Sequence, residues 1–108
     1  MNNISCSFEA ISYIEIILQK NNSNMLRISL RAGKCNGFYI DLECCSSIAN
    51  TDIVIDVSLN RKILIDAKSY KFLEGMRIEY KNTLMFKGFD FIIPKAKSKC
   101  GCGESINF

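Results

Sequence analysis

Two stretches of alternating apolar and polar residues, joined by a short loop that begins and ends with glycine, constrain the fold most. Apolar residues recur at every second position in residues 26–32 and again in residues 38–44. This period of two is typical of half-buried β-strands. The connection at residues 33–37 contains two glycines and one asparagine, which favour a tight loop with positive φ angles. The sequence therefore predicts two successive strands with Cys35 at the exposed apex of their connection.

The remaining chain is also rich in predicted strands. Residues 7–20 carry apolar side chains at three-to-four spacing, which predicts one amphipathic helix packed on a sheet. Asp66 is expected to cap a second, short helix that ends at Gly75. Further strands are predicted at residues 53–57, 63–65, 76–80 and 89–93, with Pro94 ending the last. About six strands and one or two short helices, without regular β–α alternation, favour a compact α+β, mainly β fold.

The length and charge of the chain limit the possible domain organisation and the possible classes of function. A chain of 108 residues is the size of one domain, so residues 1–108 are predicted to form a single domain. Residues from about 95 to 108 are basic at first and then rich in cysteine and glycine, which predicts a flexible, cysteine-containing C-terminal tail. The net charge of +3 is mild and dispersed, which argues against a nucleic-acid-binding protein.

Neither a membrane segment nor a secretory signal is predicted from the sequence. It has no run of 18 apolar residues, and its first residues lack a basic region followed by a long apolar region. We therefore expect a cytoplasmic protein without membrane contact, whose cysteines are kept reduced. Clustered cysteines in that compartment more often serve metal or redox chemistry than structural disulfides.

The chain contains six cysteines and no histidine. The lack of histidine excludes Ser-His and Cys-His catalytic pairs and His-ligated zinc, and we expect no enzymatic activity. Cys6, Cys44 and Cys45 are interpreted as small, partly apolar structural residues. Neighbouring side chains on a strand point to opposite faces, so the adjacent pair Cys44 and Cys45 is poorly suited to chelation.

Cys35, Cys100 and Cys102 differ from the other cysteines because they lie in glycine-rich stretches, and lysines nearby favour their thiolate forms. Three thiolates suit a metal ion or an iron–sulfur cluster. A [2Fe–2S] cluster takes four protein ligands, so a site shared between two chains is attractive, and Glu104 is a candidate oxygen ligand. Two alternatives remain open: a metal-free thiol–disulfide switch that joins Cys35 to Cys100 or Cys102, and a structural zinc site.

Several stretches together resemble the A-type iron–sulfur cluster carriers, the HesB/IscA/SufA family. The most specific is the closing Cys-Gly-Cys-Gly-Glu-Ser at residues 100–105, preceded by a single upstream Cys-x-Gly at Cys35. The other matching stretches are residues 26–37, 72–80 and 88–94. This chain departs from the usual family pattern at Lys34, Asn36 and Ile93, and the three other cysteines lie outside that pattern.

The resemblance implies a compact HesB-like domain of β-sandwich or barrel-like form. It also implies that Cys35, Cys100 and Cys102 bind a [2Fe–2S] cluster, a [4Fe–4S] cluster or iron. The cargo would come from a cluster-donating scaffold and pass to apo iron–sulfur acceptor proteins. Family members form homodimers or homotetramers with the cluster at a subunit interface, and the same is expected here.

Overall fold

The structure is a computed structural model that describes residues 3–33, 37–58, 60–85, 87–99 and 106–108. Nine strands and two helices lie in these ranges. In chain order they are β1 (Ser5–Cys6), α1 (Phe8–Lys20), β2 (Met25–Ala32), β3 (Phe38–Cys45), β4 (Asp52–Ser58), β5 (Arg61–Asp66), α2 (Ala67–Leu73), β6 (Arg77–Asn82), β7 (Lys87–Ile92), β8 (Ser98–Lys99) and β9 (Ile106–Asn107).

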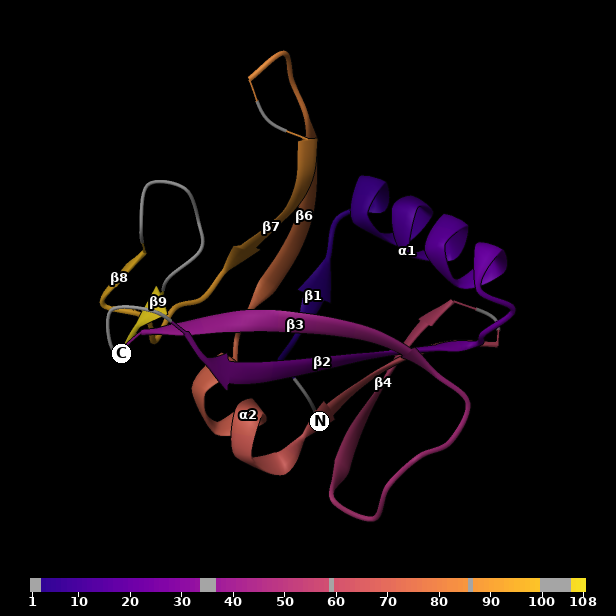
Figure 1. Ribbon diagram of the computed structural model, residues 1–108, viewed down its shortest axis with the longest axis horizontal. Coiled ribbons are helices and arrows are strands. Elements are labelled where there is room, and N and C mark those ends of the chain that lie inside the picture. The colour runs from indigo at the N-terminus through magenta and orange to yellow at the C-terminus, as the bar shows by residue number, and fades with distance from the viewer. Residues whose placement is uncertain (1–2, 34–36, 59, 86, 100–105) are drawn as a thin grey trace.

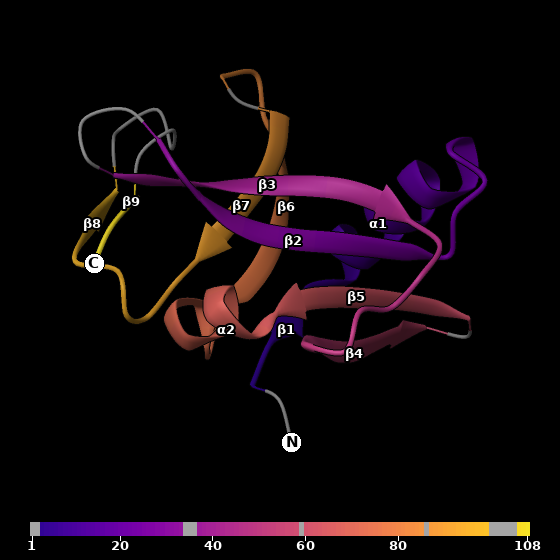
Figure 2. The same cartoon turned by 60° about the horizontal axis from the view of Figure 1, so that its bottom comes forward.

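The strands form two sheets. The larger sheet has the order β4-β5-β2-β3-β9-β8 and the smaller has the order β1-β6-β7. The predicted pair β2 and β3 is antiparallel along its whole length, from Met25 opposite Cys45 to Ala32 opposite Phe38. The β6–β7 hairpin extends away from the larger sheet, and α1 lies at one side of this hairpin (Figure 1). α2 follows β5 and lies below the end of β2 that leads to residue 33 (Figure 2).

The hydrophobic core follows from the period-two and three-to-four patterns. Leu26 and Ile28 of β2 are buried on the same face as Ile63 and Ile65 of β5, their partners in the parallel β2–β5 pairing. One core cluster includes these four residues and side chains of α1, β6 and β9. Its other members are Ile4, Ala10, Ile14, Leu18, Ile55, Leu73, Met76, Ile78, Ile93 and Ile106. The predicted α+β, mainly β class is confirmed.

The predicted helix boundaries also agree with the structure. The Ala10 amide donates to Ser7 Oγ over 3.2 Å at the start of α1. The Ser69 amide donates to Asp66 Oδ2 over 3.1 Å at the start of α2. After α2, Gly75 has a φ of +84°, a conformation that glycine adopts without strain.

The C-terminal segment differs from the expected flexible tail. Within residues 95–108, β8 and β9 belong to the larger sheet, and Ile106 is only 2% exposed. The burial of Ile106 explains why a segment of only two residues joins the sheet. The remaining part of the predicted tail, residues 100–105, lies outside the described residues.

On the outer face of the larger sheet, an ion pair links β2 to the start of β4. The Asp52 carboxylate is fully buried and accepts hydrogen bonds from the Arg27 guanidinium and, over 2.7 Å, from the Ala49 amide. The hydrogen bond from Arg27 lowers the pKa of Asp52 below its ordinary value. A carboxyl group whose pKa is lowered by folding stabilises the fold above its unfolded-state pKa, and this stabilisation is lost as the pH falls through the folded-state pKa.

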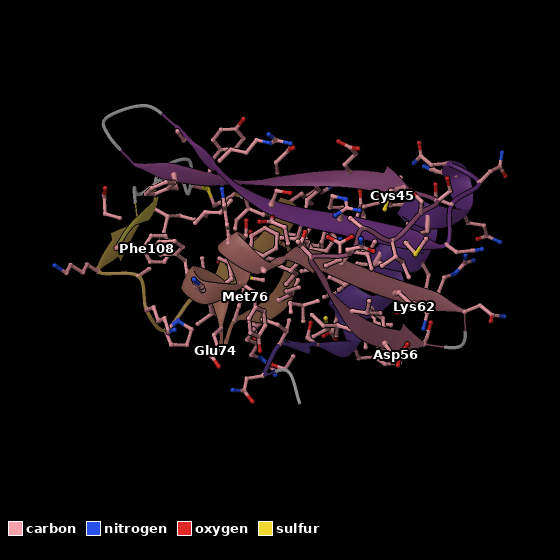
Figure 3. All side chains as sticks on the ribbon, turned by 90° about the horizontal axis from the view of Figure 1, so that it is seen from below. Cys45, Asp56, Lys62, Glu74, Met76 and Phe108 are labelled. Atoms are coloured by element: carbon pink, nitrogen blue, oxygen red, sulfur yellow. The ribbon has the colours of Figure 1, made fainter. Side chains whose placement is uncertain are left out.

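Replacing Asp52 by alanine is expected to lower the free energy of unfolding at pH 7 by about 2 kcal/mol, because the partly buried Arg27 guanidinium and the Ala49 amide lose their acceptor. The difference in free energy of unfolding between the variant and the wild type should shrink in acid, because protonation of the Asp52 carboxyl weakens its ion pair in the wild type. Urea denaturation at pH 7 and pH 3 measures both effects. Asp56→Ala is the matched control, since Asp56 pairs with Lys62 at the exposed edge of the sheet and should change stability little (Figure 3). An equal loss in both variants, or a loss that does not depend on pH, would contradict the assignment.

Candidate functional site

The two segments that carry the predicted ligands begin and end at the same end of the larger sheet. β9 lies between β3 and β8, and Ile106 is opposite Phe38 on one side and Lys99 on the other. The base of the β2–β3 connection is closed by a hydrogen bond from the Gly33 amide to the Gly37 carbonyl at 2.7 Å. The described residues at the ends of these two segments are 33 and 37 in the first and 99 and 106 in the second. They therefore lie together around the short strand β9 (Figure 2).

Apolar packing holds β9 in this place. The Phe108 ring centroid lies 5.9 Å from that of Phe38 and 5.1 Å from that of Phe72 in α2. The amide of Lys97 donates to the Asn107 carbonyl over 2.6 Å. Figure 3 shows Phe108 at this end of the β2–β3 pair. Aromatic contacts of this kind stabilise beyond their buried area, so the last residues of the chain anchor the segment that precedes them.

The sequence pattern does not predict a functional role for Ile106 and Phe108. Their only signal is that they flank Asn107 with the apolar period of a strand, and two apolar residues at a chain end are too few to predict one. The predicted ligands themselves, Cys35, Cys100, Cys102 and Glu104, lie outside the described residues. In the part of the chain that the structure describes, no group of three or more Cys, Asp or Glu residues is placed to hold a metal ion.

The profile of the iron–sulphur cluster biosynthesis family matches residues 2–104. The chain belongs to this family, that of the A-type iron–sulfur carriers. It is 34% identical over 99 residues to the iron-sulfur cluster insertion protein ErpA of Legionella pneumophila, covering 86% of this chain and 76% of that protein. It is 32% identical over 105 residues to the iron-binding protein IscA of Yersinia enterocolitica, covering 96% and 97% of the two chains.

The fold agrees with this membership in the A-type carrier family. A crystal structure of IscA with the [2Fe-2S] cluster superposes with a TM-score of 0.82 at 28% identity, over 96% of each chain. The resemblance and the HesB-like fold predicted from the sequence are therefore confirmed. The family profile ends at residue 104, so β9 and Phe108 lie beyond the matched residues.

Cys44 and Cys45 lie at the opposite end of β3 from the Cys35 loop. The eight residues of β3 span about 24 Å at the rise of an extended strand. Cys45 and Phe108 mark the two ends in Figure 3. This separation makes Cys44 and Cys45 unsuited to join a site at the Cys35 end.

Cys6 lies in β1 of the smaller sheet, opposite Ile78. Cys6 and Cys44 are partly buried against the hydrophobic core. Burial raises the pKa of the Cys6 thiol, with Arg77 opposing the effect in part, and burial also raises the pKa of the Cys44 thiol. Protonated thiols are poor metal ligands, which agrees with the structural role expected for both residues.

No helix within the described ranges is long and apolar enough to cross a membrane.

Proposed function

We propose that this A-type carrier is not an enzyme, and that it binds its cargo through Cys35, Cys100 and Cys102 and passes it to apoproteins. The cargo is an iron–sulfur cluster, with [2Fe–2S] favoured over [4Fe–4S], or iron. The observation that carries this proposal is the pairing of β9 with both β3 and β8. Phe38 and Lys99 lie on either side of Ile106, two strand spacings or about 10 Å apart.

The chain length between these anchors and the cysteines supports a common site. Cys35 comes three residues before Phe38, and Cys100 directly follows Lys99. Consecutive Cα atoms are about 3.8 Å apart, so both cysteines are within reach of a common centre. Thiolates are the usual protein ligands of iron–sulfur clusters, and the donor set of this chain fits such cargo.

Three thiolates leave a four-ligand cluster one ligand short. A second copy of the chain would complete the coordination, and Glu104 is an alternative oxygen ligand. We therefore propose a homodimer or homotetramer with the cluster at a subunit interface. The family membership supports a role between a cluster-donating scaffold and apo iron–sulfur acceptors, and the need for reduced thiolates supports a cytoplasmic location.

Transfer proceeds by ligand exchange. A thiolate of the acceptor binds to iron as one cysteine of this chain leaves it, and the exchange repeats until the cluster is released. No electron is gained or lost in this exchange. Such a role is supported by two relatives of this chain, an iron-sulfur cluster insertion protein and an iron-binding protein.

Anaerobic reconstitution with iron and sulfide tests this function. We expect the protein to acquire a visible cluster spectrum and a matching Mössbauer signal, and to lose both when an apo-ferredoxin is added and becomes loaded. The solution mass of the loaded protein reports the oligomer. A protein that binds no iron and instead forms one reversible disulfide at a defined potential would be a thiol–disulfide switch, and the carrier proposal would be wrong.

A further inference from the structure

The hairpin of β6 and β7 carries the two most exposed large apolar side chains in the part of the chain that the structure describes. It extends away from the larger sheet (Figure 1). Between its strands, Leu84 is fully exposed and Met85 is 94% exposed. Ile92, at the other end of β7, is 45% exposed. Large exposed apolar side chains that project together usually mark an interaction site.

The hairpin also ends the smaller sheet. The order of this sheet is β1-β6-β7, so β7 is a terminal strand, and among the described residues no strand pairs with its second edge. A terminal strand is a template on which a further strand can pair. Two copies of one chain can pair through such an edge across a two-fold axis, because each then uses the same surface.

The residues of β7 limit the register of such a pair. Residues directly opposite each other in an antiparallel pair have side chains on the same face, so the axis must pass through a residue. An axis at Phe89 pairs residues 87–91 of both copies and an axis at Asp90 pairs residues 88–92, whereas any other axis pairs fewer residues of β7. The axis at Asp90 places two carboxylates opposite each other, which is destabilising. The axis at Phe89 places two aromatic rings opposite each other, which is stabilising.

The axis at Phe89 also brings opposite charges together. Gly88 then lies opposite the partner's Asp90, and Lys81 is the neighbour of Gly88 on β6. Lys81 and the partner's Asp90 are two strand spacings apart, about 10 Å between Cα atoms. Glycine has no side chain, so Lys81 can extend over Gly88 to reach this carboxylate. Within one copy, Lys81 Nζ lies 3.2 Å from Asp90 Oδ2, so both side chains are on the required face of the hairpin.

The same register covers the exposed apolar residues. Before residue 87 the chain of one copy continues into its hairpin tip, and after residue 91 the chain of the other copy continues into Ile92. Leu84 and Met85 of one copy therefore lie beside the partner's Ile92. This contact removes from water apolar side chains that a single copy leaves exposed.

We propose that two copies of the chain associate through antiparallel β7 strands centred on Phe89, with each hairpin tip packed against the partner's Ile92. The contact contains no cysteine, so it forms without cargo and is distinct from the cluster-bridged interface proposed above. Together the two interfaces give a tetramer, a step that rests on the proposed carrier function, whereas the β7 contact does not.

Sedimentation equilibrium of the cluster-free protein under reducing conditions tests this interface. We expect the wild type to dimerise reversibly and Leu84→Glu to dimerise about tenfold more weakly, because a charge enters an apolar contact. Leu84 is fully exposed in one copy, so this variant should keep its fold. Ile48→Glu is the matched control. Ile48 is a half-exposed apolar residue between β3 and β4 of the larger sheet, and its variant should dimerise as the wild type does.

A charge exchange tests the register. Lys81→Asp should weaken dimerisation about fivefold, because a carboxylate then faces the partner's Asp90. Combining Lys81→Asp with Asp90→Lys restores opposite charges and should restore the wild-type association. If the combined variant remained as weak as Lys81→Asp, the register centred on Phe89 would be wrong.

Hydrogen exchange locates the contact. The amides of residues 87–91 should exchange more slowly in concentrated than in dilute protein, because dimerisation covers the edge of β7. The amides of β2 lie in the other sheet, and their exchange should not depend on concentration.

Three results would overturn the proposal: a cluster-free wild type that is monomeric at millimolar concentration, equal association of Leu84→Glu and the wild type, or exchange in β7 that does not depend on concentration. If Leu84→Glu weakened only the binding of an apo-ferredoxin or of anionic phospholipid vesicles, the tip would contact an acceptor or a membrane, and the second copy would be excluded. None of these measurements needs a cluster. Failure of the carrier function is seen separately, as a wild type that binds no cluster during anaerobic reconstitution.

Discussion

Replacement of Cys35 by serine is expected to reduce the cluster retained after anaerobic reconstitution and desalting by about tenfold or more. The cysteine thiolate is the characteristic protein ligand of iron–sulfur clusters, and a serine hydroxyl is a much weaker donor to iron. With only three candidate thiolates per chain, loss of one leaves two. Iron and sulfide content, together with the visible absorbance, measures the effect.

Cys45→Ser is the matched control, because the same chemical change is made at the other end of β3, about 24 Å away. This variant should retain its cluster as the wild type does. Retention of a full cluster by Cys35→Ser, or an equal loss in both variants, would show that Cys35 is not a ligand.

Ile106→Ala is expected to shorten the lifetime of the bound cluster several-fold and to lower the free energy of unfolding by about 2–4 kcal/mol. Ile106 is 2% exposed and pairs with both Phe38 and Lys99. Its truncation removes the apolar contact that holds β9 between β3 and β8. The backbone that follows Cys35 and the backbone that precedes Cys100 would then lose their common anchor. Absorbance decay in the presence of a chelator and urea denaturation measure the two effects.

The control variant Leu18→Ala distinguishes an effect on the position of the cluster ligands from an effect on the overall stability of the fold. Leu18 is fully buried in α1, so its truncation should cost a similar free energy of unfolding. α1 takes no part in the β3–β9–β8 pairing, and the cluster lifetime should therefore change little. If both variants released the cluster equally fast, β9 would have no particular role in holding the site.

Local patterns predicted most of the long elements. The period-two alternation predicted β2 and β3, and the three-to-four spacing predicted α1. α2 begins after Asp66 and ends before Gly75, as expected, because helix capping and left-handed backbone conformations depend on the type of residue at these positions. These features rest on interactions within a few residues, which are present in the sequence.

The strands β8 and β9 could not be predicted from such local patterns. Each has two residues, too few for any period to be recognised, and each exists through pairing with a distant strand and burial of Ile106.

The sequence by itself determined the chemistry of this protein: six thiols, no imidazole, and a cysteine–glycine ending that resembles the A-type carriers. Cys35 and Cys100 are 65 positions apart, and no local interaction links them. Only the tertiary structure decided that the strands next to them meet, through a β9 that pairs on both sides. The physical reason is that residue types carry their own reactivity, whereas the proximity of distant residues depends on the packing of the whole chain.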